Sequence, residues 1–205
     1  LCDKVESTEY AWTSTLLLEL TNYFVPVRNH VIARSPISRI SSRGAHCVGF
    51  SADGGFVYGM QREDGRLILG GFRHTESDGR FGVSQWNDAT SDASVFSKMR
   101  QFVRDSFDVE DDGDLVEEAW TGIIGWSCDD TPWVGPVPGR DSVYVCAGFS
   151  GHGMTQAFLC GKMVAEMVLG EDSPSLYVES FRPNFSRART ANYEAGHTAD
   201  SEVSE

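Results

Sequence analysis

The most regular hydrophobic pattern in the chain lies between Asp92 and Phe107. Apolar side chains recur there at three- and four-residue intervals, which places them on one face of a helix. They are Val95, Phe96, Met99, Phe102 and Val103. Ser91 or Asp92 can accept hydrogen bonds from the first turn. The pattern predicts an amphipathic helix whose apolar face packs against a sheet.

Strand patterns occur on both sides of this helix. Two apolar runs, 56–61 and 66–71, flank Arg62-Glu63-Asp64-Gly65, and the Asp-Gly pair supplies the positive φ that a tight turn needs, so a β-hairpin is predicted. Further strands are predicted at 23–33 and 116–126, a short helix at 13–20 capped by Thr13 or Ser14, and a loop at 35–47. Pro26 lacks an N–H group, which indicates a sheet edge or the start of its strand.

A short apolar segment, 143–147, is typical of a buried parallel strand. It runs into a glycine-rich turn and then a predicted helix from about Met154 to Leu169, which Gly170 ends. The expected buried face of this helix consists of Met154, Ala157, Phe158, Gly161, Val164, Ala165 and Val168. The small residues Ala157 and Gly161 predict close approach to a neighbouring element. No periodicity follows residue 171, and disorder is expected from about residue 187.

Composition narrows the possible functions. The 205 residues carry a formal net charge of -13, and the stretch 105–118 contains eight acidic residues and no basic one. Such a chain repels nucleic acid and anionic lipid, so neither is expected as a partner. Five cysteines without a CxxC pair argue against a disulfide framework and a zinc site, so no metal is expected. Reduced thiols suit the cytoplasm, the predicted location, and no apolar run is long enough to span a bilayer.

The glycine-rich turn is the segment with the clearest chemistry. Gly148, Gly151 and Gly153 lack Cβ atoms, so a planar group could approach the backbone there. The following helix begins with unpaired N–H groups and the positive end of its dipole, which stabilise negative charge. A reduced flavin carries such charge at N1 and O2. The alternative is a turn that is glycine-rich for packing alone.

Five segments in the same order resemble the D-amino-acid oxidase family, which includes glycine, sarcosine and fructosyl-amine oxidases. They are Ala11–Leu17, Phe24–Arg28, the hairpin Tyr58–Gly71, Trp120–Pro138 and Tyr144–Met154. The run Gly148-Phe149-Ser150-Gly151-His152-Gly153 is especially similar to the sarcosine and fructosyl-amine branch. The resemblance covers roughly residues 10–172.

The resemblance implies a mixed α/β fold: the C-terminal part of a Rossmann-like FAD domain plus an antiparallel-sheet substrate domain. The segments expected are 1–21 and 116–172 for the FAD domain, 22–115 for substrate binding, and a partly disordered tail at 173–205. The family's N-terminal GxGxxG fingerprint is absent and the chain begins with Leu1, so we expect a fragment.

The resemblance also implies roles for individual residues. Cofactor contacts would come, largely through backbone N–H groups, from Gly148, Phe149, Ser150, Gly151, His152, Gly153, Met154 and Thr155. His152 is either near the flavin edge or a structural residue at the helix start, and Tyr58 is either substrate-facing or part of the core. The implied reaction passes a hydride from a C–N bond of an amine or amino-acid-like substrate to non-covalent FAD, with dioxygen as acceptor.

Three departures from the family pattern limit what can be carried over. Ile124 stands where some relatives place a carboxylate-binding arginine, so a simple α-amino acid is expected only if Arg62 or Arg73 takes over. Thr155 and Gln156 stand where a lysine occurs in the sarcosine branch. Gly122 stands where a cysteine attaches FAD, and Cys128 is expected to be an ordinary buried thiol. The alternative function is a remnant that folds without binding flavin.

Overall fold

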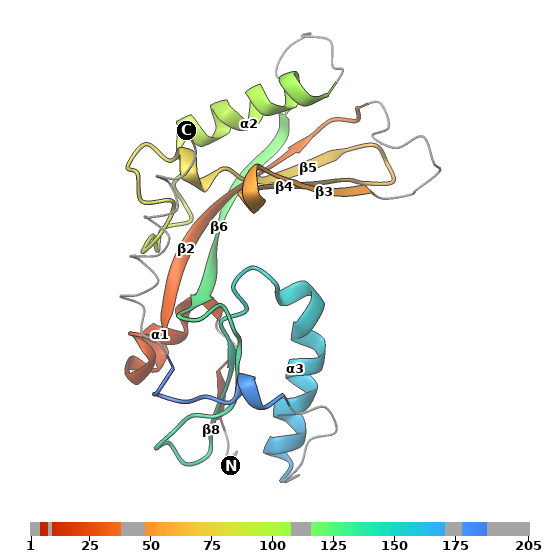
Figure 1. The fold of residues 1–205 in the computed structure, drawn as a ribbon. Coiled ribbons are helices and arrows are strands. Elements are labelled where there is room, and N and C mark those ends of the chain that lie inside the picture. The colour runs from red at the N-terminus through yellow and green to blue at the C-terminus, as the bar shows by residue number, and fades with distance from the viewer. Residues whose placement is uncertain (1–4, 8–9, 38–47, 108–115, 171–177, 188–205) are drawn as a thin grey trace. The chain divides into compact units, whose positions relative to one another are not determined.

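The computed structural model describes residues 5–7, 10–37, 48–107, 116–170 and 178–187 (Figure 1). The chain divides into two compact units, whose boundaries fall inside two long strands. We call residues 28–123 the inserted unit, because they interrupt the sequence of the other. Residues 1–27 and 124–205 together form the divided unit.

The inserted unit is built on a five-stranded sheet with the order β3-β4-β5-β2-β6. Its strands are β2 (Phe24–Arg34), β3 (Val48–Ala52), β4 (Val57–Gln61), β5 (Leu67–Gly71) and β6 (Val116–Ser127), of which β2 and β6 continue into the divided unit. The pairs β3/β4, β4/β5 and β5/β2 are antiparallel. The predicted hairpin is confirmed as β4 and β5. Pro26 lies at the start of β2, before the residues that pair with β5.

Helix α2 (Ala93–Ser106) covers one face of this sheet (Figure 1). Val95, Met99 and Val103 are buried against Ile32, Val57, Leu67 and Leu69, and Phe96 and Phe102 are partly buried beside them. The Asp92 side chain accepts the N–H of Ser94 and caps the helix. The predicted helix, its cap and its apolar face are therefore confirmed. Strand β3 was not predicted.

The divided unit contains a three-stranded sheet with the order β1-β8-β7. Strand β8 (Val143–Ala147) pairs in parallel with β1 (Val5–Ser7) and antiparallel with β7 (Trp133–Pro136). Its main core gathers Leu20, Tyr23, Phe24, Trp133 and Val145. Helix α3 (Gly153–Val168) follows β8 and packs beside it. The rest of the unit includes 3₁₀ turns at Tyr10–Trp12, Leu18–Leu20 and Glu179–Phe181, and the short helix α1 (Thr13–Leu16).

Three local predictions about helices are wrong. The helix expected at 13–20 breaks at Leu17, and neither Thr13 nor Ser14 caps it, because both are buried and the residue before the helix is Trp12. The expected inner face of α3 is mostly exposed: Met154 is fully exposed and Phe158 is 86% exposed.

Of the expected face only Val164 is buried, and the other buried residues of α3 are Cys160 and Met163. Among the described residues, nothing lies within 4 Å of the position that a Gly161 Cβ would take, so the predicted close approach at Gly161 is also wrong.

Other predictions fall outside the described residues. These are most of the acidic stretch, most of the 35–47 loop and the tail beyond residue 187. Within the described ranges, no helix combines the length and apolar character needed to cross a membrane.

Candidate functional site

The glycine-rich turn begins where β8 ends, and its first residue has to be glycine. Gly148 has a φ of +74°, a left-handed conformation that side chains disfavour. A Cβ there would lie 2.4 Å from Cε1 of Phe24 and 3.0 Å from Cβ of Ser127. Phe24 is itself buried and packed edge-on against Trp133. The turn is therefore held tightly against the core of the divided unit.

The next two side chains of the turn point inward. Phe149 is buried with Met163 and Val164 of α3. Ser150 is 1% exposed, and its Oγ accepts the N–H of Ser127 at 3.1 Å. The Ser150 N–H donates to the carbonyl of Gly125 at 3.3 Å. Phe149 and Ser150 thus fasten the turn to α3 and β6, which leaves their side chains unavailable to a ligand.

Most residues around the first turn of α3 are exposed, in contrast to Phe149 and Ser150. Gly151, His152, Met154 and Thr155 are exposed, and no side chain caps the helix at His152. The His152 Nδ1 lies 3.0 Å from the carbonyl oxygen of Ser150, a contact that holds the ring beside the turn. The first N–H groups of a helix have no acceptor inside it, so those at Gly153, Met154 and Thr155 have no partner within α3. This donor set fits an anionic or electron-accepting group such as the pyrimidine end of a flavin.

Tyr58 lies on β4 in the inserted unit, on the face of the sheet opposite α2. The side chain is 42% exposed, and its hydroxyl oxygen accepts a hydrogen bond from Nδ2 of Asn29 at 3.0 Å. Burial of the ring raises the pKa of the phenol above its usual value, although the Asn29 hydrogen bond lowers it. Tyr58 is therefore an uncharged hydroxyl at neutral pH. The hydroxyl is thus anchored to Asn29 while the residue remains partly exposed.

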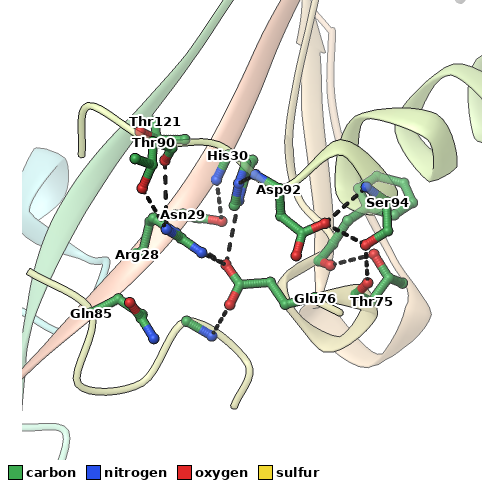
Figure 2. Close-up of polar contacts among 12 residues, drawn as sticks. Arg28, Asn29, His30, Thr75, Glu76, Gln85, Thr90, Asp92, Ser94 and Thr121 are labelled. Atoms are coloured by element: carbon green, nitrogen blue, oxygen red, sulfur yellow. Dashed lines mark hydrogen bonds and ion pairs between the residues drawn. The ribbon is translucent and has the colours of Figure 1, made fainter. Parts of the chain in front are cut away.

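Asn29 belongs to a buried polar cluster on β2 that sequence reasoning missed (Figure 2). Arg28 donates from Nε and Nη2 to Oε1 of Glu76 at 3.3 and 3.2 Å, and from Nη1 to the Thr90 hydroxyl at 3.2 Å. The other oxygen of Glu76 accepts the N–H of Gly82 at 2.8 Å. These bonds fasten residues 76–90 to β2. The three consecutive polar residues Arg28, Asn29 and His30, in the middle of a largely apolar strand, are the signal that could have revealed the cluster.

His30 is the third polar residue of that strand. Its ring is fully buried, and Nε2 accepts the backbone N–H of Asp92 at 3.0 Å. Burial, and then the neighbouring charge of Arg28, lower the pKa of His30 to about 4. The imidazole is therefore neutral, which is the form that can accept at Nε2.

The proposed substitutes for a carboxylate-binding arginine have other partners. Arg62 pairs with Asp64 in the β4–β5 turn, with 3.3 Å between Nη2 and Oδ2. The Arg73 guanidinium lies over the Phe56 ring at 5.1 Å from its centre. Cys128 is a free, buried thiol whose pKa is raised to about 11, first by burial and then by Asp129. It has the character expected of an ordinary core cysteine.

The structure brings the predicted cofactor residues together in one turn, which is continuous in sequence. Tyr58 lies in the inserted unit. Neither the buried role of Ser150 nor the link from Tyr58 to Asn29 could be anticipated, because both depend on contacts between strands distant in the sequence.

The chain is similar in sequence to known FAD-dependent oxidoreductases. Residues 10–167 match the DAO family, described as FAD dependent oxidoreductase. A probable oxidoreductase OrdL from Haemophilus influenzae is 29% identical over 150 residues, which cover 72% of this chain and 31% of the relative. A glycine oxidase from Bacillus licheniformis is 25% identical over 125 residues, or 61% of this chain and 31% of the relative. The chain thus spans about a third of the length of these curated relatives.

The fold agrees with this match. The crystal structure of glycine oxidase from Geobacillus kaustophilus superposes with a TM-score of 0.61 at 16% identity, covering 89% of this chain and 45% of that one. The likeness confirms the predicted mixed α/β fold, with its antiparallel sheet, as that of an FAD-dependent oxidase. Because the family match extends over more than half of the sequence, the chain belongs to the DAO family of FAD-dependent oxidoreductases.

Proposed function

We propose that this chain forms the flavin-facing and substrate-facing parts of an amine or amino-acid oxidoreductase, and that it is a fragment of a longer cytoplasmic enzyme. The observation that carries the proposal is the exposed first turn of α3, which no side chain caps, inside the segment that matches the family. The name of the B. licheniformis relative, a glycine oxidase, supports a small amine-bearing substrate. Dioxygen is the proposed electron acceptor.

FAD, when bound, would supply the hydride-accepting chemistry. The role of this chain would be to hold and polarise it. The donors at the start of α3 would stabilise negative charge at the pyrimidine end, an electrostatic contribution made by fixed groups. Gly151 would leave the backbone accessible, and His152 would lie near the ring edge. Binding would be non-covalent, since Gly122 cannot form a thioether and Cys128 is buried with a raised pKa.

The substrate side would be provided by Tyr58, whose neutral hydroxyl can hydrogen-bond to a bound amine or amino-acid-like molecule. The ion pair of Arg62 with Asp64 supports the expectation that the substrate is not a simple α-amino acid. No general base would be required to break the C–H bond, because its electron pair would leave with the hydride and the lone pair of the amine nitrogen would form the C=N bond.

Flavin binding tests the proposal directly. The purified chain, mixed with FAD and passed through a desalting column, should retain a flavin absorption band. Gly151→Leu should weaken binding about tenfold or more, which is about 1.4 kcal/mol, by placing a side chain over the donors.

Gly170→Leu is the matched control, because Gly170 has a positive φ like that of Gly151, has open space around its Cβ position, and lies beyond the other end of α3. A colourless native chain would mean that it does not bind FAD alone and would favour the non-catalytic remnant. Equal binding by the two leucine variants would remove the turn from the site.

A further inference from the structure

Tyr58 reaches across a neighbouring strand because that strand offers no side chain in the way. Tyr58 pairs with Gly70 on β5, and Gly70 pairs in turn with Val31 on β2. A Cβ on Gly70 would lie 2.5 Å from Cζ of Tyr58 and 2.6 Å from its hydroxyl oxygen. The ring thus lies flat over Gly70, and its hydroxyl meets a residue two strands away. Gly70 has no positive φ, so its lack of a side chain matters for space alone.

The residue that the hydroxyl meets is Asn29, and the direction of their hydrogen bond is fixed. Asn29 is 7% exposed, and its Oδ1 accepts the backbone N–H of His30 at 3.1 Å. A backbone N–H can only donate, so the amide oxygen has to face His30 and the amide nitrogen has to face Tyr58. Nδ2 also can only donate. The Tyr58 oxygen is therefore the acceptor, and its own proton points away from Asn29.

We propose that Asn29 and Gly70 are positioning residues that hold the Tyr58 hydroxyl as a hydrogen-bond donor on the face of the sheet opposite α2. This rests on the proposed substrate-side role of Tyr58. Among the described residues, no group accepts the Tyr58 proton, and nearly half of the side chain is exposed. The ligand group received there is consequently an acceptor, such as a carboxylate or carbonyl oxygen, and not an ammonium group.

The surroundings explain why this orientation persists. Asn29 sits between Arg28 and His30, and both are fixed by the polar cluster that joins β2 to residues 76–92 (Figure 2). On the same face of β4, Met60 is 40% exposed and offers no polar competitor for the phenol. A side chain that only filled space over Gly70 would need neither the buried amide nor its fixed direction.

Nuclear magnetic resonance of the whole chain labelled with ¹³Cζ-tyrosine tests this without flavin. The Tyr58 signal is assigned by its loss in Tyr58→Phe. In Asn29→Asp, one oxygen still accepts from His30 while the other faces the phenol, so the negative charge should move the Tyr58 titration midpoint upward. In Gly70→Ala, the new methyl group should push the ring into solvent and move the midpoint downward, toward that of an exposed tyrosine.

Asn87→Asp is the control, since it makes the same change of charge in the inserted unit at an exposed residue. It should leave Tyr58 unchanged. The ¹³Cζ shift at pH 7 provides a second reading that needs no alkaline solution, and it should differ from the native value in Asn29→Asp and Gly70→Ala only. A Tyr58 signal that stays native in Asn29→Asp by both measures overturns the proposal. Failure of the chain to bind FAD would count against the proposed function and leave this result intact.

Discussion

Replacing Gly148 by alanine should damage the divided unit more than a one-methyl change suggests. The left-handed backbone at φ +74° costs a residue with a side chain about 1–2 kcal/mol. The new Cβ would lie 2.4 Å from Phe24, which cannot retreat because it is 3% exposed and packed on Trp133. Forcing extra volume into such a core costs about 1–3 kcal/mol. Together these predict a loss of about 2–5 kcal/mol in the free energy of unfolding.

Urea unfolding followed by circular dichroism measures this loss, and hydrogen exchange of peptides from α3 assigns it to the divided unit. Gly161→Ala is the matched control, since Gly161 lies inside α3 with free space at its Cβ position. It should be neutral or stabilising by up to about 1 kcal/mol, because alanine favours helix. Ordinary surface substitutions change the free energy of unfolding by about 0.5 kcal/mol or less. If the effect of Gly148→Ala is no larger than that, Gly148 does not fit tightly against Phe24.

Two further predictions concern the polar cluster of β2. Glu76→Ala should cost about 3–5 kcal/mol in urea unfolding, because it leaves Arg28 buried without its carboxylate. The double change of Glu76→Leu with Arg28→Met should recover part of that loss, since it removes the unpaired charge but still leaves the N–H of Gly82 without its acceptor. An absence of any recovery would contradict the ion-pair explanation. The lowered pKa of His30 means that the unfolded chain takes up a proton first as the pH falls. Stability should therefore be intact above pH 6.5 and decline by about 3 kcal/mol toward pH 4, and this decline should be missing in His30→Gln.

Some elements of the fold could be predicted because their signals are local. Helix α2 has a strict apolar period and an aspartate at its start, and the β4–β5 hairpin has an Asp-Gly turn. The buried face of helix α3, in contrast, could not be predicted from periodicity. The helix is apolar on nearly all sides, so periodicity could not choose between the face with Cys160 and Met163 and the face with Met154 and Phe158.

In the candidate site, too, contiguous residues could be predicted from the sequence, and contacts between distant strands could not. The glycine turn was identified from its sequence, because its residues are contiguous and resemble a known motif. The partnership of Tyr58, Gly70 and Asn29 depends on the register of three strands, which a single sequence does not fix. The inward placement of Ser150 likewise depends on Ser127, from a strand that precedes the turn.

The division of one unit by the other has a consequence for the order of folding. Strand β1 pairs with β8 through partners such as Val5 and Val143, so this sheet cannot close until almost the whole intervening sequence is available. Closing so long a loop lowers the entropy of the chain before the β1–β8 contacts can stabilise it. The effective loop is shorter if the inserted unit has already become compact. During synthesis we therefore expect residues 28–123 to collapse first on the ribosome, and the glycine turn to acquire its shape among the last features of the molecule.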